Sequence, residues 1–165
     1  MKIAFRLVLL AAAAALGFWC WLILFPSPEQ LVLKKISSLA RTATISAGDS
    51  NLTRAAKVSN LISYFTPDAE ISFEVTDYHA RTLSGREEIR EAAVAGFTSL
   101  TSLKVQFLDA TAHIAADKLT ADVSCTARVT AGNSKEFGVQ ELHIQLKKIA
   151  GDWLITRVET VKTLS

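Results

Sequence analysis

The stretch Tyr64–Ile89 constrains the fold most, because it holds the signals for four consecutive elements. Pro67 ends a helix, since the residue before a proline avoids the helical region. Apolar and polar residues then alternate over residues 71–75, which is typical of a half-buried strand. A polar turn and a returning strand follow. Ser84 and Glu87 then have the spacing of a capping box, which predicts the start of another helix.

Two helices are predicted before this stretch. Ser27 and Gln30 form a capping box around a proline at the first helical position, and apolar residues follow at helical spacing up to Ala43. A polar segment breaks this helix, and either Asp49 or Ser50 can cap the next one. The chain that links the apolar N-terminal segment to the first helix is very short, so we expect the domain to lie close to the bilayer and not on a long tether.

Strands are predicted after the third helix. The clearest runs over residues 118–130, where apolar and polar residues alternate strictly, as one buried face and one polar face require. Gly132-Asn133 fits a two-residue hairpin turn, and that register sets Val123 opposite Leu142. A further turn at Ala150-Gly151 leads into the last strand.

The predicted order is helix, helix, strand, strand, helix and then four antiparallel strands. Helices grouped early and a meander of hairpins afterwards indicate an α+β fold. We expect a cone-shaped, curved antiparallel sheet that wraps around the N-terminal helices and leaves a pocket at its open end.

The N-terminal segment differs in composition from the rest of the chain. Leu7–Phe25 contains no charged residue, and Lys2 and Arg6 precede it. At 1.5 Å per residue, a helix over this run reaches roughly 28 Å, about the hydrocarbon thickness of a bilayer. We therefore expect a transmembrane signal anchor over residues 1–25 and one domain over residues 26–165.

Two interpretations of this run are open, a retained anchor and a cleaved signal peptide. A cleavage site needs small residues after the apolar region, whereas Ala11–Ala15 lie in its middle and large apolar residues follow up to Phe25. The pattern favours a single-pass anchor. Because Lys and Arg stay on the cytoplasmic side, we expect a cytoplasmic N-terminus and an extracytoplasmic domain, on the periplasmic face of a bacterial inner membrane.

The charge of the domain argues against a nucleic-acid partner. Residues 26–165 contain 16 acidic and 16 basic side chains, and a nucleic-acid surface needs a basic patch to meet the phosphates.

Cys125 is the one cysteine beyond the apolar segment, so no disulfide can form within the domain, and its alternating neighbours predict a buried side chain. No Cys or His spacing fits a metal site, and we expect no cofactor.

Three segments carry a resemblance to a known family. They are Phe65–Ile71 at the helix-to-strand junction, Gly85–Arg90 at the start of the third helix, and Gly151–Ile155 at the last hairpin. In this order they resemble the nuclear transport factor 2 family, with its SnoaL-like and ketosteroid-isomerase-like members, over roughly Ser27–Val161. The resemblance implies a cystatin-like cone. Its members include enzymes, small-molecule binders and scaffolds, so the fold alone does not fix the function.

The first hairpin supplies one set of candidate catalytic residues, Glu74, Asp77, Tyr78 and His79. An isomerase-like member needs a carboxylate base and an oxyanion donor in a dry pocket. Four polar residues around a hairpin tip are also what a solvated turn contains. No residue of the chain can be matched to the catalytic acid and tyrosine of the isomerase-like members.

The second hairpin supplies another candidate pair, because the predicted register sets Asp122 opposite His143. A carboxylate commonly orients an imidazole, yet both residues lie on the polar face of the sheet. We expect this face to be a partner surface through which two copies of the chain pair. Its residues are Thr120, Asp122, Ser124, Thr126, Arg128, Glu141 and His143.

These observations predict a membrane-anchored extracytoplasmic binding or scaffold domain without catalysis. It resembles the small extracytoplasmic domains of envelope complexes, and its expected partners are the membrane, a second copy, and an envelope complex or a small apolar ligand. The alternative is a small-molecule pocket enzyme of isomerase, dehydratase or cyclase type. An acid or His that points into an enclosed apolar cavity would favour the enzyme.

Overall fold

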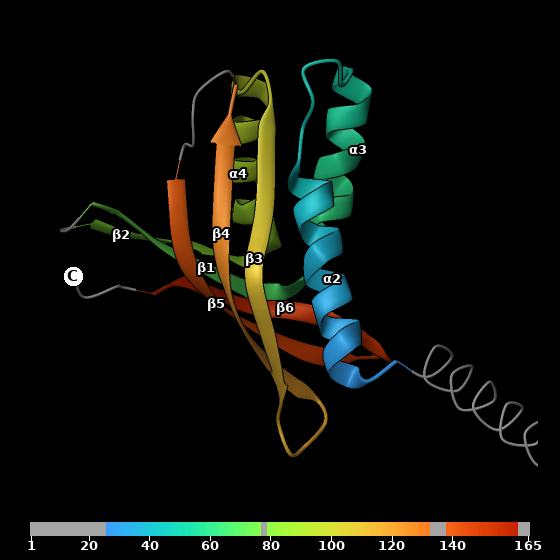
Figure 1. Ribbon diagram of the computed structural model, residues 1–165. Helices are drawn as coiled ribbons and strands as arrows, with labels where there is room; N and C mark the ends of the chain where they lie inside the picture. The colour runs from blue at the N-terminus through green and yellow to red at the C-terminus, as the bar shows by residue number, and fades with distance from the viewer. Residues whose placement is uncertain (1–25, 77–78, 133–137, 162–165) are drawn as a thin grey trace, which may run out of the picture.

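The computed structural model describes residues 26–76, 79–132 and 138–161 and has the predicted α+β architecture. In chain order the elements are α2 (Pro28–Ala43), α3 (Asn51–Ile62), β1 (Phe65–Thr76), β2 (His79–Ser84), α4 (Gly85–Ser99), β3 (Leu103–Ile114), β4 (Thr120–Ala131), β5 (Gly138–Ile149) and β6 (Asp152–Thr160). Figure 1 shows a bent sheet, with α2 and α3 on one side and α4 behind the strands. Among the described residues, no helix is long and apolar enough to cross a membrane. The predicted anchor, Leu7–Phe25, lies outside the described residues.

The sheet is mixed, whereas the sequence predicted an antiparallel one. Its strand order is β2-β1-β6-β5-β4-β3. Strands β1 and β6 run parallel, with Phe65 opposite Ile155, and the other neighbouring pairs are antiparallel. The parallel contact reaches back to the end of α3, because the Ile155 amide donates to the Tyr64 carbonyl oxygen at 2.8 Å. The prediction was wrong because the order of elements along the chain does not reveal that the first strand lies beside the last.

The junction between α3 and β1 is held by the start of α4. The Arg86 guanidinium donates from both Nε, at 2.8 Å, and Nη2 to the carbonyl oxygen of Phe65. Gly85 has a φ of +79°, and a Cβ there would lie 3.4 Å from the Pro67 carbonyl oxygen. A side chain would therefore be strained by its backbone conformation and in close contact with the neighbouring strand. Two of the segments that carry the family resemblance thus meet at this junction.

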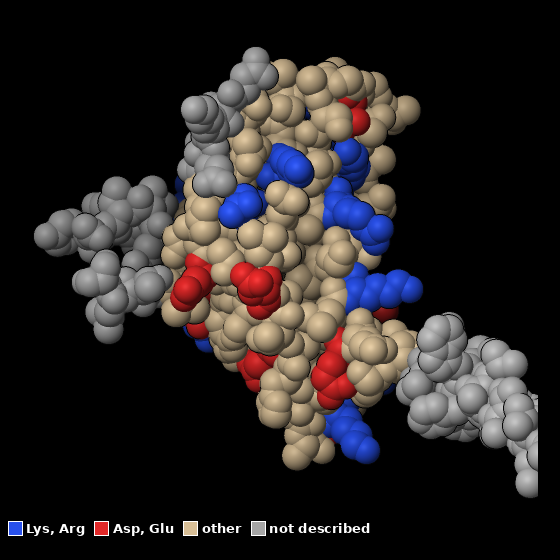
Figure 2. All heavy atoms as spheres, in the orientation of Figure 1, with Lys and Arg blue, Asp and Glu red and all other residues tan. Residues whose placement is uncertain are grey.

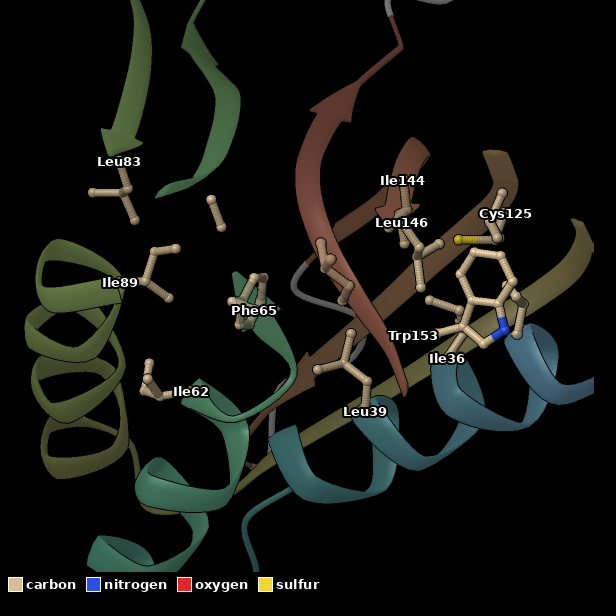
Figure 3. Packing of buried hydrophobic residues seen from close by; sticks show 14 of the residues in the cluster. Ile36, Leu39, Ile62, Phe65, Leu83, Ile89, Cys125, Ile144, Leu146 and Trp153 are labelled. Carbon is tan, nitrogen blue, oxygen red and sulfur yellow. The ribbon is translucent and has the colours of Figure 1, made fainter. Parts of the chain in front are cut away.

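Among the described residues, a single core joins the sheet to α2, α3 and α4 (Figure 3). Trp153 is 4% exposed and belongs to this core, and Cys125 is 5% exposed, so the predicted burial of Cys125 is confirmed. Each fully buried aliphatic side chain contributes roughly 1.5–3 kcal/mol. The described core includes Ile36 and Leu39 of α2, Ile62 of α3, Ile89 and Phe97 of α4, and Val123, Ile144, Leu146, Trp153 and Ile155 of the sheet.

The predicted helix caps are confirmed for α2 and changed for α4. Ser27 and Gln30 form the capping box of α2. Ser50 caps α3, which decides between the two predicted candidates. Ser84 precedes α4 but makes no side-chain cap bond. Its backbone amide instead donates to Glu88 Oε2 at 2.7 Å, so Glu88 takes the place predicted for Glu87.

The register of the β4–β5 hairpin differs from the prediction by two residues. Val123 lies opposite Ile144 rather than Leu142, and Gly138 pairs with Val129. The connection is therefore longer than the predicted two-residue turn, of which Asn133 lies outside the described residues. Because side chains alternate with a period of two, a shift of two keeps every residue on its predicted face.

Candidate functional site

The candidate residues of the first hairpin lie largely outside what the structure describes. Thr76 pairs with His79 at the end of β1 and β2, so a hairpin is present where the sequence predicted one. Asp77 and Tyr78 fall in the gap between described residues. The side chains of Glu74 and His79 are also not described. A catalytic role for these four residues therefore stays a prediction.

The structure brings Asp122 and His143 together, although not as the predicted cross-strand pair. His143 lies opposite Ser124, and Asp122 lies opposite Gln145. The pair is a diagonal one, with His143 Nε2 3.3 Å from Asp122 Oδ1. The two side chains are 32% and 46% exposed, so water reaches both. An ion pair of this kind contributes about 0–1 kcal/mol, and its exposure is unlike the dry site that proton abstraction needs.

The predicted partner surface is a continuous outward face of the sheet. Its β4 residues alternate with the buried residues of the same strand. His113 of β3 lies opposite Asp122 and extends the face. A bulge in β3 interrupts the ladder between Leu108 and Thr111, and beside it lies a hollow of about 320 Å³ lined in part by Asp109, Ser124 and Glu141.

Charged side chains also border this face at β6. Arg157 Nε lies 2.5 Å from Glu159 Oε1, and Arg157 Nη2 lies 3.9 Å from Glu70 Oε2 on β1. The face is therefore polar and partly ordered by its own ion pairs. Pairing of two copies stays a prediction, because the structure contains one chain.

A wider hollow of about 560 Å³ lies at the edge of the sheet, between α2 and β3. The wall from α2 and the wall from the edge strand are both largely apolar. The apolar lining residues are Leu33, Ile36 and Ala40 of α2 and Val105, Phe107, Leu108 and Ala110 of β3. We call this hollow the α2–β3 groove.

One end of the α2–β3 groove is closed by hydrogen bonds across the gap. Thr44 Oγ1 accepts from the Val105 amide at 3.1 Å and donates to the Ala40 carbonyl oxygen at 2.9 Å. Ile45 forms an isolated bridge with Leu103. Two cations, Arg41 and Lys104, line the groove near this end. These contacts fix the spacing of helix and strand, so the groove is part of the folded architecture.

The lining of the groove is apolar with a few polar side chains. Among its described lining residues there is no carboxylate and no imidazole; the polar ones carry hydroxyl, amide, guanidinium or ammonium groups. The one described thiol lies elsewhere, because Cys125 belongs to the core, and burial raises its pKa to about 11. A protonated thiol is a poor nucleophile at neutral pH. The described residues also contain no cluster of acids, His and Cys that could hold a metal.

Sequence reasoning missed the groove because its two walls lie roughly 65 residues apart and neither carries a motif. One signal was present. Helix α2 has apolar residues beyond its buried stripe, Leu31 and Leu33, of which Leu33 lines the groove. Apolar residues of a helix that are not buried in the core can form part of a ligand-binding surface.

Comparison with known proteins identifies the family. The sequence model of the SnoaL-like domain matches residues 54–159. No curated protein matches the chain.

Solved structures share the fold at low sequence identity. Aln2 from a Streptomyces species has a TM-score of 0.65 at 17% identity, over 84% of this chain and 94% of its own. A single-residue variant of Rv3472 from Mycobacterium tuberculosis, a protein of unknown function, has a TM-score of 0.62 at 19% identity, over 82% and 78%. A protein from Streptomyces avermitilis, provisionally described as a dehydratase of the NTF2-like family, has a TM-score of 0.60 at 13% identity, over 82% and 97%.

At these identities the solved structures show the fold alone, and the matched sequence model covers more than half of the chain. The chain belongs to the SnoaL-like domain family.

Proposed function

We propose that this chain is a membrane-anchored, extracytoplasmic binding domain that does no chemistry on its ligand. The observation that supports the proposal is the α2–β3 groove. Its volume of about 560 Å³ lies within the range of roughly 300–1,000 Å³ typical of small-molecule sites. Apolar walls with a few polar groups at one end are also typical of such sites.

The lining of the groove supports binding without reaction. A general acid or base has to lie within hydrogen-bond reach of the proton it transfers. The described lining offers apolar surface, hydroxyl groups and two cations, of which the cations Arg41 and Lys104 can hold a charge in place. These groups suit recognition and retention of a ligand.

The proposed location rests on the apolar segment Leu7–Phe25 and on the short chain after it. Helix α2 begins at Pro28, three residues beyond that segment. The domain would therefore sit close to the bilayer surface, and the groove would lie within reach of molecules that leave the membrane. The positive-inside rule supports a cytoplasmic N-terminus, because Lys2 and Arg6 precede the apolar segment.

The alternative function is a pocket enzyme of isomerase, dehydratase or cyclase type. It is favoured by the polar residues of the β1–β2 hairpin, Glu74, Asp77, Tyr78 and His79, and by a solved structure of this fold that is provisionally described as a dehydratase. A catalytic pocket of that kind would use the hairpin end of the molecule instead of the α2–β3 groove.

A second copy of the chain is the proposed protein partner. The outward sheet face is richer in Thr than in Lys and Glu, which are among the residues depleted at interface centres. Isologous pairing is the commonest arrangement of homo-oligomers. An envelope complex could use the same face, since the opposite face of the sheet packs on the helices.

Filling part of the groove should weaken binding without unfolding the protein. The full chain, in phosphatidylcholine nanodiscs, is exposed to decyl probes that carry a photoreactive diazirine at the tail and one of three headgroups, a carboxylate, a hydroxyl or a trimethylammonium. We expect at least one probe to label the peptides that contain residues 33–44 and 104–110. Ser37→Trp, at an exposed lining position, should reduce that labelling about tenfold, equivalent to about 1.4 kcal/mol.

Lys34→Trp is the matched control, because Lys34 is exposed on the same helix and does not line the groove. It should leave labelling unchanged, and probe incubated with the protein without irradiation should be recovered with its mass unchanged. Labelling that concentrates at the β1–β2 hairpin, or a probe returned with altered mass, would support the enzyme instead.

The topology is tested with a reporter fused after Ser165. Alkaline phosphatase, which folds to its active form outside the cytoplasm, should be active in this fusion, and the protein should remain in the membrane fraction after a high-salt wash. A reporter that works only in the cytoplasm would reverse the proposed orientation. A mature N-terminus near Ser27 would show a cleaved signal peptide in place of the anchor.

Pairing through the sheet is tested by charge reversal. The full chain in detergent should sediment as a weak dimer, and Arg128→Glu on the outward face should shift it to monomer with unchanged circular dichroism. Arg90→Glu, on the exposed side of α4, makes the same charge change away from the sheet and should not affect the equilibrium. A monomer at every concentration would remove the proposed partner surface.

A further inference from the structure

The two ends of the α2–β3 groove differ in chemistry. Helix and strand run in opposite directions, because Thr44 at the end of α2 contacts Val105 near the start of β3. Arg41 and Lys104 therefore lie toward the same end. Leu33, from the first half of the helix, and Ala110, from the second half of the strand, lie toward the other. From Leu33 to Thr44 the helical rise of 1.5 Å per residue gives a length of roughly 16 Å.

The surface charge also differs between the two ends of the groove. In Figure 2, which shows this face of the molecule, most Lys and Arg gather over the upper parts of α2, β3 and β4, and Asp and Glu gather lower down. The start of β3 and the end of α2 lie in that upper part in Figure 1. An anionic group at the Arg41 and Lys104 end of the groove would thus lie in a region of positive charge.

The Arg41 side chain has capacity for a ligand. It donates one hydrogen bond, from Nη2 to Ser38 Oγ at 3.0 Å, and a guanidinium has five N–H donors in all. Lys104 lines the groove from the edge strand, where its pairing with Thr130 sets it on the outward face of the sheet, so its ammonium adds positive charge at the rim of the groove. A carboxylate held by the guanidinium makes charge-assisted bonds, which are stronger than neutral ones.

The edge of the sheet adds a backbone donor to the groove. In an antiparallel strand, alternate residues direct their N–H groups to the same side. The amides of Leu103 and Val105 point away from β4, to the Ile45 carbonyl oxygen at 2.9 Å and to Thr44 Oγ1 at 3.1 Å. The alternation sets the Phe107 amide on this same side, where the groove lies. An edge-strand amide can donate to a ligand oxygen.

We propose that the α2–β3 groove binds an amphiphilic monoanion, an alkyl chain that ends in a carboxylate. The carboxylate binds to Arg41 at the end of the groove where Lys104 forms the rim, and the chain runs toward Leu33 and Ala110 along the apolar walls. This inference rests on the proposed binding function and adds the class of ligand to it. The charged end of the groove and its apolar length together match a molecule with one anionic head and one apolar tail.

The test compares the three photoreactive decyl probes, which share a tail and differ only in the headgroup. In the full chain in phosphatidylcholine nanodiscs, the carboxylate probe should label the groove peptides at least about fivefold more strongly than the hydroxyl probe, and the trimethylammonium probe least. Unlabelled decanoate should compete, and decan-1-ol should compete poorly.

Charge reversal at Lys104 tests whether this residue contributes to recognition of the carboxylate. Lys104→Glu should lower labelling by the carboxylate probe about fivefold and leave labelling by the hydroxyl probe unchanged. Lys34→Glu makes the same change in net charge on α2, outside the groove, and should leave both unchanged.

Two results would overturn the inference and leave the proposed function standing. One is a hydroxyl probe that labels the groove as strongly as the carboxylate probe, and the other is an equal loss in Lys34→Glu and Lys104→Glu. If no probe labels the groove at all, the proposed binding function falls together with the inference.

Discussion

The pair of hydrogen bonds from Arg86 to the Phe65 carbonyl oxygen is the contact on which the rest of the structure depends. Phe65 is the first residue of β1 and is 4% exposed, so its carbonyl group is costly to leave without a partner. At the same point Ile155 of β6 bonds to Tyr64. The end of α3, the start of α4 and the two parallel strands therefore meet within a few residues.

Much of the fold could be predicted from local chemistry. Ser27 and Gln30 mark the start of α2, and the alternation over residues 118–130 assigns the two faces of β4 correctly. The register of the β4–β5 hairpin could not be predicted, because it depends on the length of the connecting turn and not on the pattern of either strand. The β1–β6 pairing was missed for a related reason, since no residue pattern distinguishes a parallel neighbour across most of the domain's length.

The site was harder to predict than the fold. Polar residues at a hairpin tip and a polar sheet face are conspicuous in a sequence, and both were singled out; the structure brings Asp122 and His143 together but leaves them in water. The α2–β3 groove arises from the contact of a helix and an edge strand that are distant in sequence. Its cations, Arg41 and Lys104, look like ordinary surface residues until the antiparallel packing of α2 on β3 sets them at one end.

The measurement that tests this account most directly is hydrogen–deuterium exchange of the full chain carrying Arg86→Ala. Loss of charge-assisted bonds to a buried carbonyl should lower the opening free energy at the Ile155 amide by about 2–3 kcal/mol, and lower it equally in β5, because one core joins them. Arg90→Ala, which removes an exposed i,i+3 ion pair from the same helix, should cost less than about 0.5 kcal/mol. Equal effects of the two substitutions, or a loss of protection confined to α4, would contradict the account.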